Sequence, residues 1–261
     1  MTREPSLLEQ VGAVARRSAT GAFRQRALLI FPMLFPLILF AINGSALSKA
    51  TEIPGFPTNN YRDFLIAMPF IQGAMFVSIS SGTSLARDIE TGFLNRLALT
   101  PLRSEAMLLG QLGGAFVLAC VQTVVYLLVG LAVGVTFASG VGGVFVLLSL
   151  SLVISFGFAS LGGLLALRLG SGEAIQGIFP LLFVTLFLSS ASLPRNLIKA
   201  PWFREVATYN PVSYLLEGLR SLVITGWNAQ ALELAFGFGV ALAAVSLAFS
   251  GRAMKSRLAR A

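Results

Sequence analysis

Charged side chains are concentrated in one short stretch of an otherwise apolar sequence, ARDIETGFLNRLALTPLRSEA at residues 86–106. Acidic and basic residues alternate along it, and Ile89, Phe93 and Leu97 recur every four residues, which predicts a short helix with an apolar stripe. Pro101 stops this helix. Such a helix can dock in a groove of a cytoplasmic partner, or it can simply rest its apolar stripe among the lipid headgroups.

A second stretch, YNPVSYLLEGLRSLV at residues 209–223, has the residue types of a short, mostly apolar helix. Asn210 is a favourable N-cap, and Pro211 suits the first helical position. Glu217 and Arg220 are three residues apart, so they can form an ion pair on one helical face. The helix is too short to cross a bilayer. It either inserts partly from the outer surface or only closes a loop at the interface.

Several kinds of chemistry are excluded by residues that the sequence lacks. It has no histidine, which rules out histidine-based metal sites, catalytic triads and proton relays. The pattern G-x-x-x-x-G-K-[ST] is absent, so the chain does not bind ATP by that means. The single cysteine, Cys120, lies in an apolar run and is interpreted as an inert, packed thiol. We therefore expect no enzyme activity, no catalytic residue, no metal site and no cofactor in this chain.

Long apolar runs surround the two polar stretches. Only 11% of residues are charged, compared with about 25% in a soluble domain, and the mean hydropathy is +0.81. About twenty apolar residues suffice for a helix to cross the hydrocarbon core. We predict an all-α integral membrane protein with six transmembrane helices, at about residues 27–47, 64–85, 107–135, 141–167, 174–193 and 231–250.

The runs divide the chain into an N-terminal segment (1–26), a six-span domain (27–250) and a basic tail (251–261). Residues 5–26 carry apolar side chains at helical spacing together with basic ones, which predicts an amphipathic helix on the inner membrane surface. This helix either orients the first span or takes part in gating. A cleaved signal peptide is the competing interpretation of the first run, but two prolines within it and five further runs argue against cleavage.

The basic residues predict the orientation. Placing both termini in the cytoplasm puts 13 of the 19 basic residues inside, as the positive-inside rule requires. The net charge of +8 therefore follows from topology, and we expect no nucleic-acid partner. The six basic residues left outside are Lys49, Arg62, Arg195, Lys199, Arg204 and Arg220.

Two runs of the sequence resemble those of a known family. They are the run from Glu90-Thr91-Gly92 through Leu97 to Pro101, and the N-P-x-x-Y-x-x-E-x-x-R run from Asn210 to Arg220. In this order within a six-span chain, they resemble the membrane subunit of type-2 ATP-binding cassette exporters. That group contains the daunorubicin-resistance permeases and the polysaccharide or teichoic-acid export permeases.

The resemblance implies that residues 86–100 form a coupling helix contacting a separate cytoplasmic ABC ATPase subunit, which binds ATP and Mg. It implies that residues 195–226 form a helical hairpin that re-enters the outer leaflet. A second permease subunit, identical or paralogous, would complete a dimer in a bacterial cytoplasmic membrane. The residues carried over are Arg87, Asp88, Ile89, Glu90, Phe93, Arg96, Leu97 and Pro101 for the coupling helix, and Asn210, Pro211, Tyr214, Glu217 and Arg220 for the hairpin.

Candidates for the transport pathway are Ser78 and Ser81 in span two, Phe35 in span one and Phe183 in span five. The serines can instead help two spans to pack, and the phenylalanines can face lipid. By the resemblance the pathway would be mostly apolar, which suits an amphipathic drug, a lipid or a lipid-linked glycan.

The alternative function is an ion-coupled secondary transporter with no ATPase partner. Such carriers usually place charged residues near the bilayer midplane. The central thirds of all six predicted spans are uncharged, which favours a transporter powered from outside the membrane.

Overall fold

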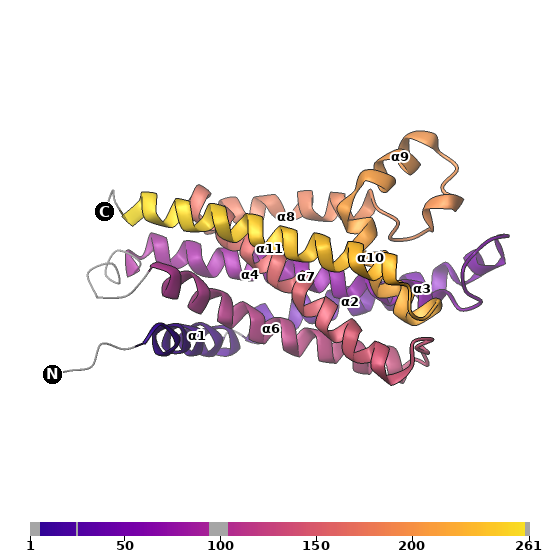
Figure 1. Ribbon diagram of the computed structural model, residues 1–261, viewed down its shortest axis with the longest axis horizontal. Helices are drawn as coiled ribbons and strands as arrows, with labels where there is room; N and C mark the ends of the chain where they lie inside the picture. The colour runs from indigo at the N-terminus through magenta and orange to yellow at the C-terminus, as the bar shows by residue number, and fades with distance from the viewer. Residues whose placement is uncertain (1–5, 25, 94–103, 259–261) are drawn as a thin grey trace.

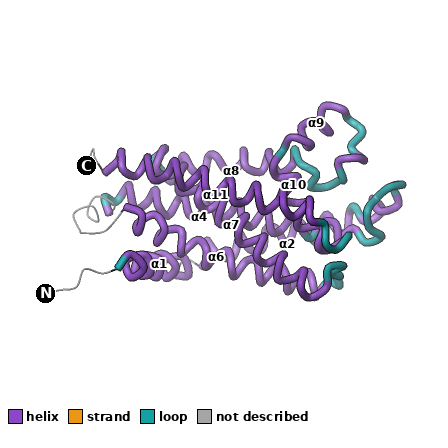
Figure 2. The backbone as a smooth tube through the Cα atoms, in the orientation of Figure 1, coloured by secondary structure: helices purple, strands orange, loops and turns teal. Residues whose placement is uncertain are grey.

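The computed structural model describes residues 6–24, 26–93 and 104–258. These residues form an elongated bundle of helices, with no strand among them (Figure 1, Figure 2). The elements in chain order are α1 (Leu7–Arg24), α2 (Arg26–Ala46), η1 (Ser48–Glu52), α3 (Tyr61–Leu65), α4 (Ala67–Glu90), α6 (Ser104–Ala132), α7 (Gly140–Leu169), α8 (Gly172–Phe187), η2 (Arg195–Leu197), α9 (Pro201–Tyr209), α10 (Pro211–Ile224) and α11 (Ala229–Leu258).

Helices occupy all six predicted apolar runs, but they differ in length, and the fifth ends at Phe187, before the predicted end at residue 193. Within the described part of the chain, four helices are long and apolar enough to cross a membrane: Tyr61–Glu90, Ala106–Ala132, Gly140–Leu169 and Ala229–Met254. The apolar parts of α2 and α8, Ile30–Ala46 and Gly172–Phe187, are shorter. At 1.5 Å per residue each measures about 25 Å, which is less than the hydrocarbon thickness of about 30 Å.

The long helices run along the long axis of the bundle, which therefore has two distinct ends (Figure 1). One end, here called the α1 end, holds α1, the last turn of α4 and the C-terminal part of α11. The opposite end, here called the α9 end, holds η1 and the pair α9 and α10. The first described helix and the C-terminal part of the last one therefore lie at the same end of the bundle.

Helix α4 is the central helix of the bundle. In its most apolar stretch 89% of the residues are buried, compared with 22% in α11. It packs against α2, α6, α7 and α8. Gly162 of α7 permits a close approach, because an added Cβ there would lie 1.9 Å from the backbone oxygen of Ser78 in α4. A helix that is surrounded on all sides needs a largely apolar surface, and the buried residues of α4 are mostly apolar, with Gln72, Ser78 and Ser81 as buried polar ones.

Helix α1 crosses α6 at three glycines. An added Cβ at Gly110 would lie 2.5 Å from the Cβ of Val14, and one at Gly114 would lie 2.3 Å from Ser18 Oγ. The predicted amphipathic helix is therefore confirmed as a helix, but Val14 packs on α6, so the apolar face does not lie wholly on the membrane surface. In Figure 1 α1 is strongly foreshortened, because it runs across the direction of the long helices.

Candidate functional site

The charged stretch begins inside α4. Residues 86–90 form the last turns of this helix rather than the start of a separate one, which corrects the prediction. The helix ends where Thr91 donates its N–H to the carbonyl of Arg87 and Gly92 takes a left-handed φ of +64°. Hydropathy placed the end too early, because charged residues can prolong an apolar helix beyond the hydrocarbon region. The predicted coupling residues Arg96, Leu97 and Pro101 lie outside the described residues.

An ion pair joins this end of α4 to α1. Arg17 donates from Nη2 to Asp88 Oδ1 at 2.9 Å and from Nη1 to Asp88 Oδ2 at 3.2 Å. The same guanidinium lies over the Phe93 ring, 3.7 Å from its centroid. A two-point contact of this kind fixes the orientation of both side chains. No local pattern could have identified Arg17, because its partner lies 71 residues along the chain and in another helix.

Glu90 contacts the first turn of α8. Its Oε1 accepts a hydrogen bond from the backbone N–H of Gly172 at 3.0 Å, where a negative charge is favourable. At the same end of the bundle, Arg257 of α11 donates to the carbonyl of Leu167 in the last turn of α7 at 2.7 Å. Three long-range contacts therefore connect α1 to α4, α4 to α8, and α11 to α7 at the α1 end.

The other predicted coupling residues divide between solvent and core. Arg87 is exposed. Ile89 packs on a small cluster that includes Leu85, Met107 and Ile175. Ile89 and Phe93 stand on opposite sides of the Gly92 turn. The apolar stripe predicted for one continuous helix is therefore interrupted between these two residues.

At the α9 end, Asn210 separates α9 from α10. Its side chain accepts from the N–H of Val212 at 2.9 Å, and its Nδ2 donates to the carbonyl of Thr185 at 2.6 Å. Pro211 is the first residue of α10. The predicted N-cap and first-turn proline are thus confirmed as local structure.

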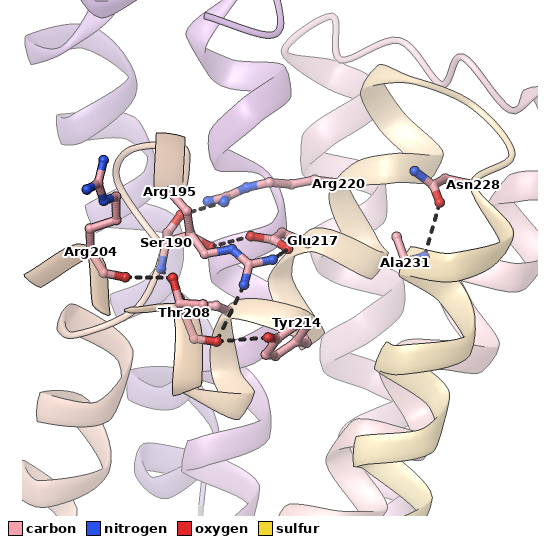
Figure 3. Close-up of polar contacts among 10 residues, drawn as sticks. Ser190, Arg195, Arg204, Thr208, Tyr214, Glu217, Arg220, Asn228 and Ala231 are labelled. Carbon is pink, nitrogen blue, oxygen red and sulfur yellow. Dashed lines mark hydrogen bonds and ion pairs between the residues drawn. The ribbon is translucent and has the colours of Figure 1, made fainter. Parts of the chain in front are cut away.

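The predicted pair of Glu217 with Arg220 is wrong. Glu217 forms its ion pair with Arg195, which follows α8, and it also accepts from Ser190 Oγ at 3.3 Å (Figure 3). Arg195 lies over the Tyr214 ring, 4.6 Å from its centroid. Partial burial opposes the charge of Arg195, but Tyr214 and the Glu217 carboxylate outweigh that effect and raise its pKa.

Arg220 points into the bundle and is only 4% exposed. Its guanidinium donates to the carbonyls of Phe64 at 2.8 Å, of Ser190 at 2.5 Å and of Ala191. Its central carbon also lies over the Phe64 ring, 3.6 Å from the ring centroid. Burial lowers the pKa of Arg220, and the nearby Glu217 carboxylate opposes this shift. Arg220 therefore holds α3, α10 and the segment after α8 together.

The predicted pathway residues form two groups. Ser78 and Ser81 are both buried in α4. Phe35 and Phe183 belong to an aromatic cluster of α2, α4 and α8, with their ring centroids 6.0 Å apart. The remaining members of this cluster are Phe31, Phe76, Phe179 and Phe187.

Residues 9–224 match the family described as ABC-2 type transporter. The chain belongs to the ABC-2 type transporter family. It is 27% identical over 202 residues to the daunorubicin resistance ABC transporter permease protein DrrB1 of Streptomyces coeruleorubidus, covering 75% of this chain and 67% of that protein.

Two further relatives of this ABC-2 chain have similar coverage. One is a putative transport permease, ycf38, of Cyanophora paradoxa, with 29% identity covering 88% of this chain and 80% of the relative. The other is the probable doxorubicin resistance ABC transporter permease protein DrrC of Mycobacterium tuberculosis, with 22% identity covering 76% and 69%. Family membership together with the apolar helices makes the chain a multi-pass permease.

Proposed function

We propose that the chain is the permease subunit of an ATP-driven exporter, powered by a separate ATPase subunit that binds ATP and Mg. The observation that carries this proposal is the charged end of α4, which is tied to α1 by Asp88 and to α8 by Glu90. A push on this end would move three helices together. The names of the relatives, which are ABC transporter permeases, support the same function.

The ATPase would dock on the α1 end, on the surface formed by Arg87, Glu90 and Phe93. The first two side chains are exposed and of opposite sign, which suits a partner surface with complementary charge. This placement makes the α1 end cytoplasmic, with both termini inside a bacterial cytoplasmic membrane. Six crossings would result if α2 and α8 also span the bilayer.

The route for the substrate would run beside the aromatic cluster, between this chain and a second permease subunit. Phe31 of α2 and Phe187 of α8 flank the cluster and are 59% and 55% exposed. An apolar wall of this kind favours an amphipathic drug, a lipid or a lipid-linked glycan over a small ion. The second subunit would cover the exposed edges of the cluster.

At the α9 end, the pair α9 and α10 would meet the outer leaflet as a re-entrant hairpin. Helix α10 is mostly buried by protein, whereas α9 exposes Trp202, Val206 and Tyr209 at spacings of four and three residues. Aromatic side chains with one polar edge favour the membrane interface. The lipid contact of the hairpin would therefore be made by α9.

The test is purification of the tagged chain from its own cells in mild detergent, followed by mass spectrometry. A stoichiometric soluble protein with a Walker A motif is expected with the wild type and lost with Glu90→Arg or Phe93→Asp. Glu205→Arg is the matched control, because Glu205 is an exposed glutamate of α9 at the opposite end.

The outcomes separate the alternatives. Normal association in both variants would show that the ATPase docks elsewhere. Failure to recover any ATPase in several detergents would contradict the exporter proposal. An ion-coupled mechanism would then be tested by transport in proteoliposomes under ion gradients.

A further inference from the structure

A small cavity lies inside the bundle, where α4, α6, α7 and α11 meet. Its volume is about 10 Å³, which is about the space that one water molecule requires. Apolar residues form much of its wall, but each of the four helices also contributes a polar side chain. These side chains are Ser81 of α4, Gln111 of α6, Ser160 of α7 and Ser250 of α11.

Two of the hydroxyls in this wall lack a hydrogen-bond partner among the described residues. Ser81 is 3% exposed and Ser250 is 2% exposed. Burying a hydroxyl without a hydrogen bond is costly, especially among apolar helices. A polar ligand in the cavity that they line would therefore stabilise both hydroxyls.

Two other buried serines of the bundle, Ser151 and Ser160, satisfy their hydroxyls within their own helices. Ser151 donates to the carbonyl of Leu147 at 2.7 Å, and Ser160 donates to that of Phe156 at 2.8 Å. This bond to the preceding turn is open to any helical serine. Ser81 and Ser250 line the cavity, and their hydroxyls do not make this bond to the preceding turn.

Another polar side chain of the cavity wall, that of Gln111, is held in place by hydrogen bonds. Gln111 donates from Nε2 to Ser84 Oγ at 2.8 Å, and its backbone oxygen accepts from Ser18 Oγ of α1 at 3.2 Å. Ser160 Oγ keeps acceptor capacity after donating to Phe156. With Ser81 and Ser250, the cavity thus offers the two to four polar partners that a buried water needs.

We propose that this cavity binds one structural water molecule, which is shared by the hydroxyls of Ser81 and Ser250 and joins α4 to α11. Neither hydroxyl reaches the other without it, since no hydrogen bond links them directly. The binding of water does not depend on the exporter proposal. If that proposal holds, the water makes α11 follow the movement of α4, whose last turn carries Asp88 and Glu90.

Thermal unfolding of Ser81→Ala, Ser250→Ala and the double variant in one detergent tests the site. Each single change removes one partner of the water, so we expect each to lower Tm by about 2–4 °C, the usual effect of losing about one hydrogen bond in a chain of this size. The double variant should lose little more than the larger single loss, because the same water is lost only once.

Ser151→Ala is the matched control, since Ser151 is equally buried and bonds within its own helix. Combined with Ser250→Ala, its effect should be additive. Unchanged or raised Tm in both cavity variants would overturn the proposal, because removing an unpaired hydroxyl without a water relieves a cost. Additive losses in the double cavity variant would also overturn it.

Gly163→Ala supplies an independent test. Gly163 lines the cavity, and its added Cβ would meet only Leu112, at 3.9 Å. The methyl group would take up space that the water needs, so Ser250→Ala should no longer lower Tm in that background, where it removes an unpaired hydroxyl. In an experimental map that resolves waters, density should lie between the Ser81 and Ser250 oxygens. Hydroxyls bonded instead to the carbonyls of Val77 and Ser246, with no density between them, would contradict the proposal.

Discussion

At the scale of single residues, a tyrosine hydroxyl supplies a hydrogen bond that a proline removes from a helix. Pro36 lacks an N–H, so the carbonyl of Pro32, four residues earlier in α2, has no helical partner. The hydroxyl of Tyr126 in α6 donates to that carbonyl at 3.0 Å. Gly73 of α4 leaves room for the ring, since an added Cβ would lie 2.6 Å from Tyr126 Cε2. The three helices are thus joined by one side chain.

Tyr126→Phe should therefore destabilise the protein, because it removes the donor and leaves the Pro32 carbonyl unpaired in an apolar environment. We expect a loss of about 1–2 kcal/mol in the free energy of unfolding, measured by thermal or denaturant unfolding in detergent. Tyr209→Phe is the control, since Tyr209 is 80% exposed and its replacement should change little. Equal stability of the two variants would mean that this hydrogen bond contributes nothing.

The two arginines of the α9 end should differ in their effects on stability. Arg220→Ala leaves three carbonyls, including the buried one of Phe64, without their donor. We therefore expect the free energy of unfolding to fall by about 3 kcal/mol or more. Arg195→Ala breaks a partly exposed ion pair with Glu217 and should lower the free energy of unfolding clearly less than Arg220→Ala does. Chemical unfolding of both variants measures the difference. A larger loss for Arg195→Ala would reverse the roles that we assign to them.

At the scale of the elements, the crossing of α1 and α6 depends on glycine. Gly114→Ala places a methyl group 2.3 Å from Ser18 Oγ and 2.8 Å from the backbone nitrogen of Ala19, so α1 has to move away. Hydrogen exchange of residues 7–24 should become faster as the helix loosens. Gly237→Ala in α11 is the control, because an added Cβ there meets nothing within 4 Å. Unchanged exchange with Gly114→Ala would show that α1 does not depend on this close approach.

The same elements show how far the sequence predicts the fold. Local signals predicted all six apolar helices, the Asn210 cap and the helical nature of α1, because periodicity and capping depend on neighbouring residues. The partners of Asp88, Glu90 and Glu217 were not predictable, since each lies in another element. Spacing made Arg220 a permitted partner of Glu217, but only the packing of the bundle decides that Arg220 turns inward.

At the scale of the whole molecule, α2 and α8 decide how many times the chain crosses the membrane. Both are short for a span, yet each connects the α1 end to the α9 end (Figure 1). If both cross, Ala13 and Glu52 lie on opposite sides of the membrane, and so do Glu173 and Glu205. All four side chains are exposed and can carry a cysteine probe.

Replacement of Cys120, the only cysteine, gives a background for single-cysteine variants at these four positions. In intact cells a membrane-impermeant maleimide should label Glu52→Cys and Glu205→Cys at once, but Ala13→Cys and Glu173→Cys only after permeabilisation. Labelling of Ala13→Cys and Glu52→Cys from the same side would show that α2 does not cross the membrane. Labelling of Glu173→Cys and Glu205→Cys from the same side would show the same for α8. A fully reversed pattern would put the charged end of α4 outside, where no ATP-driven subunit could reach it.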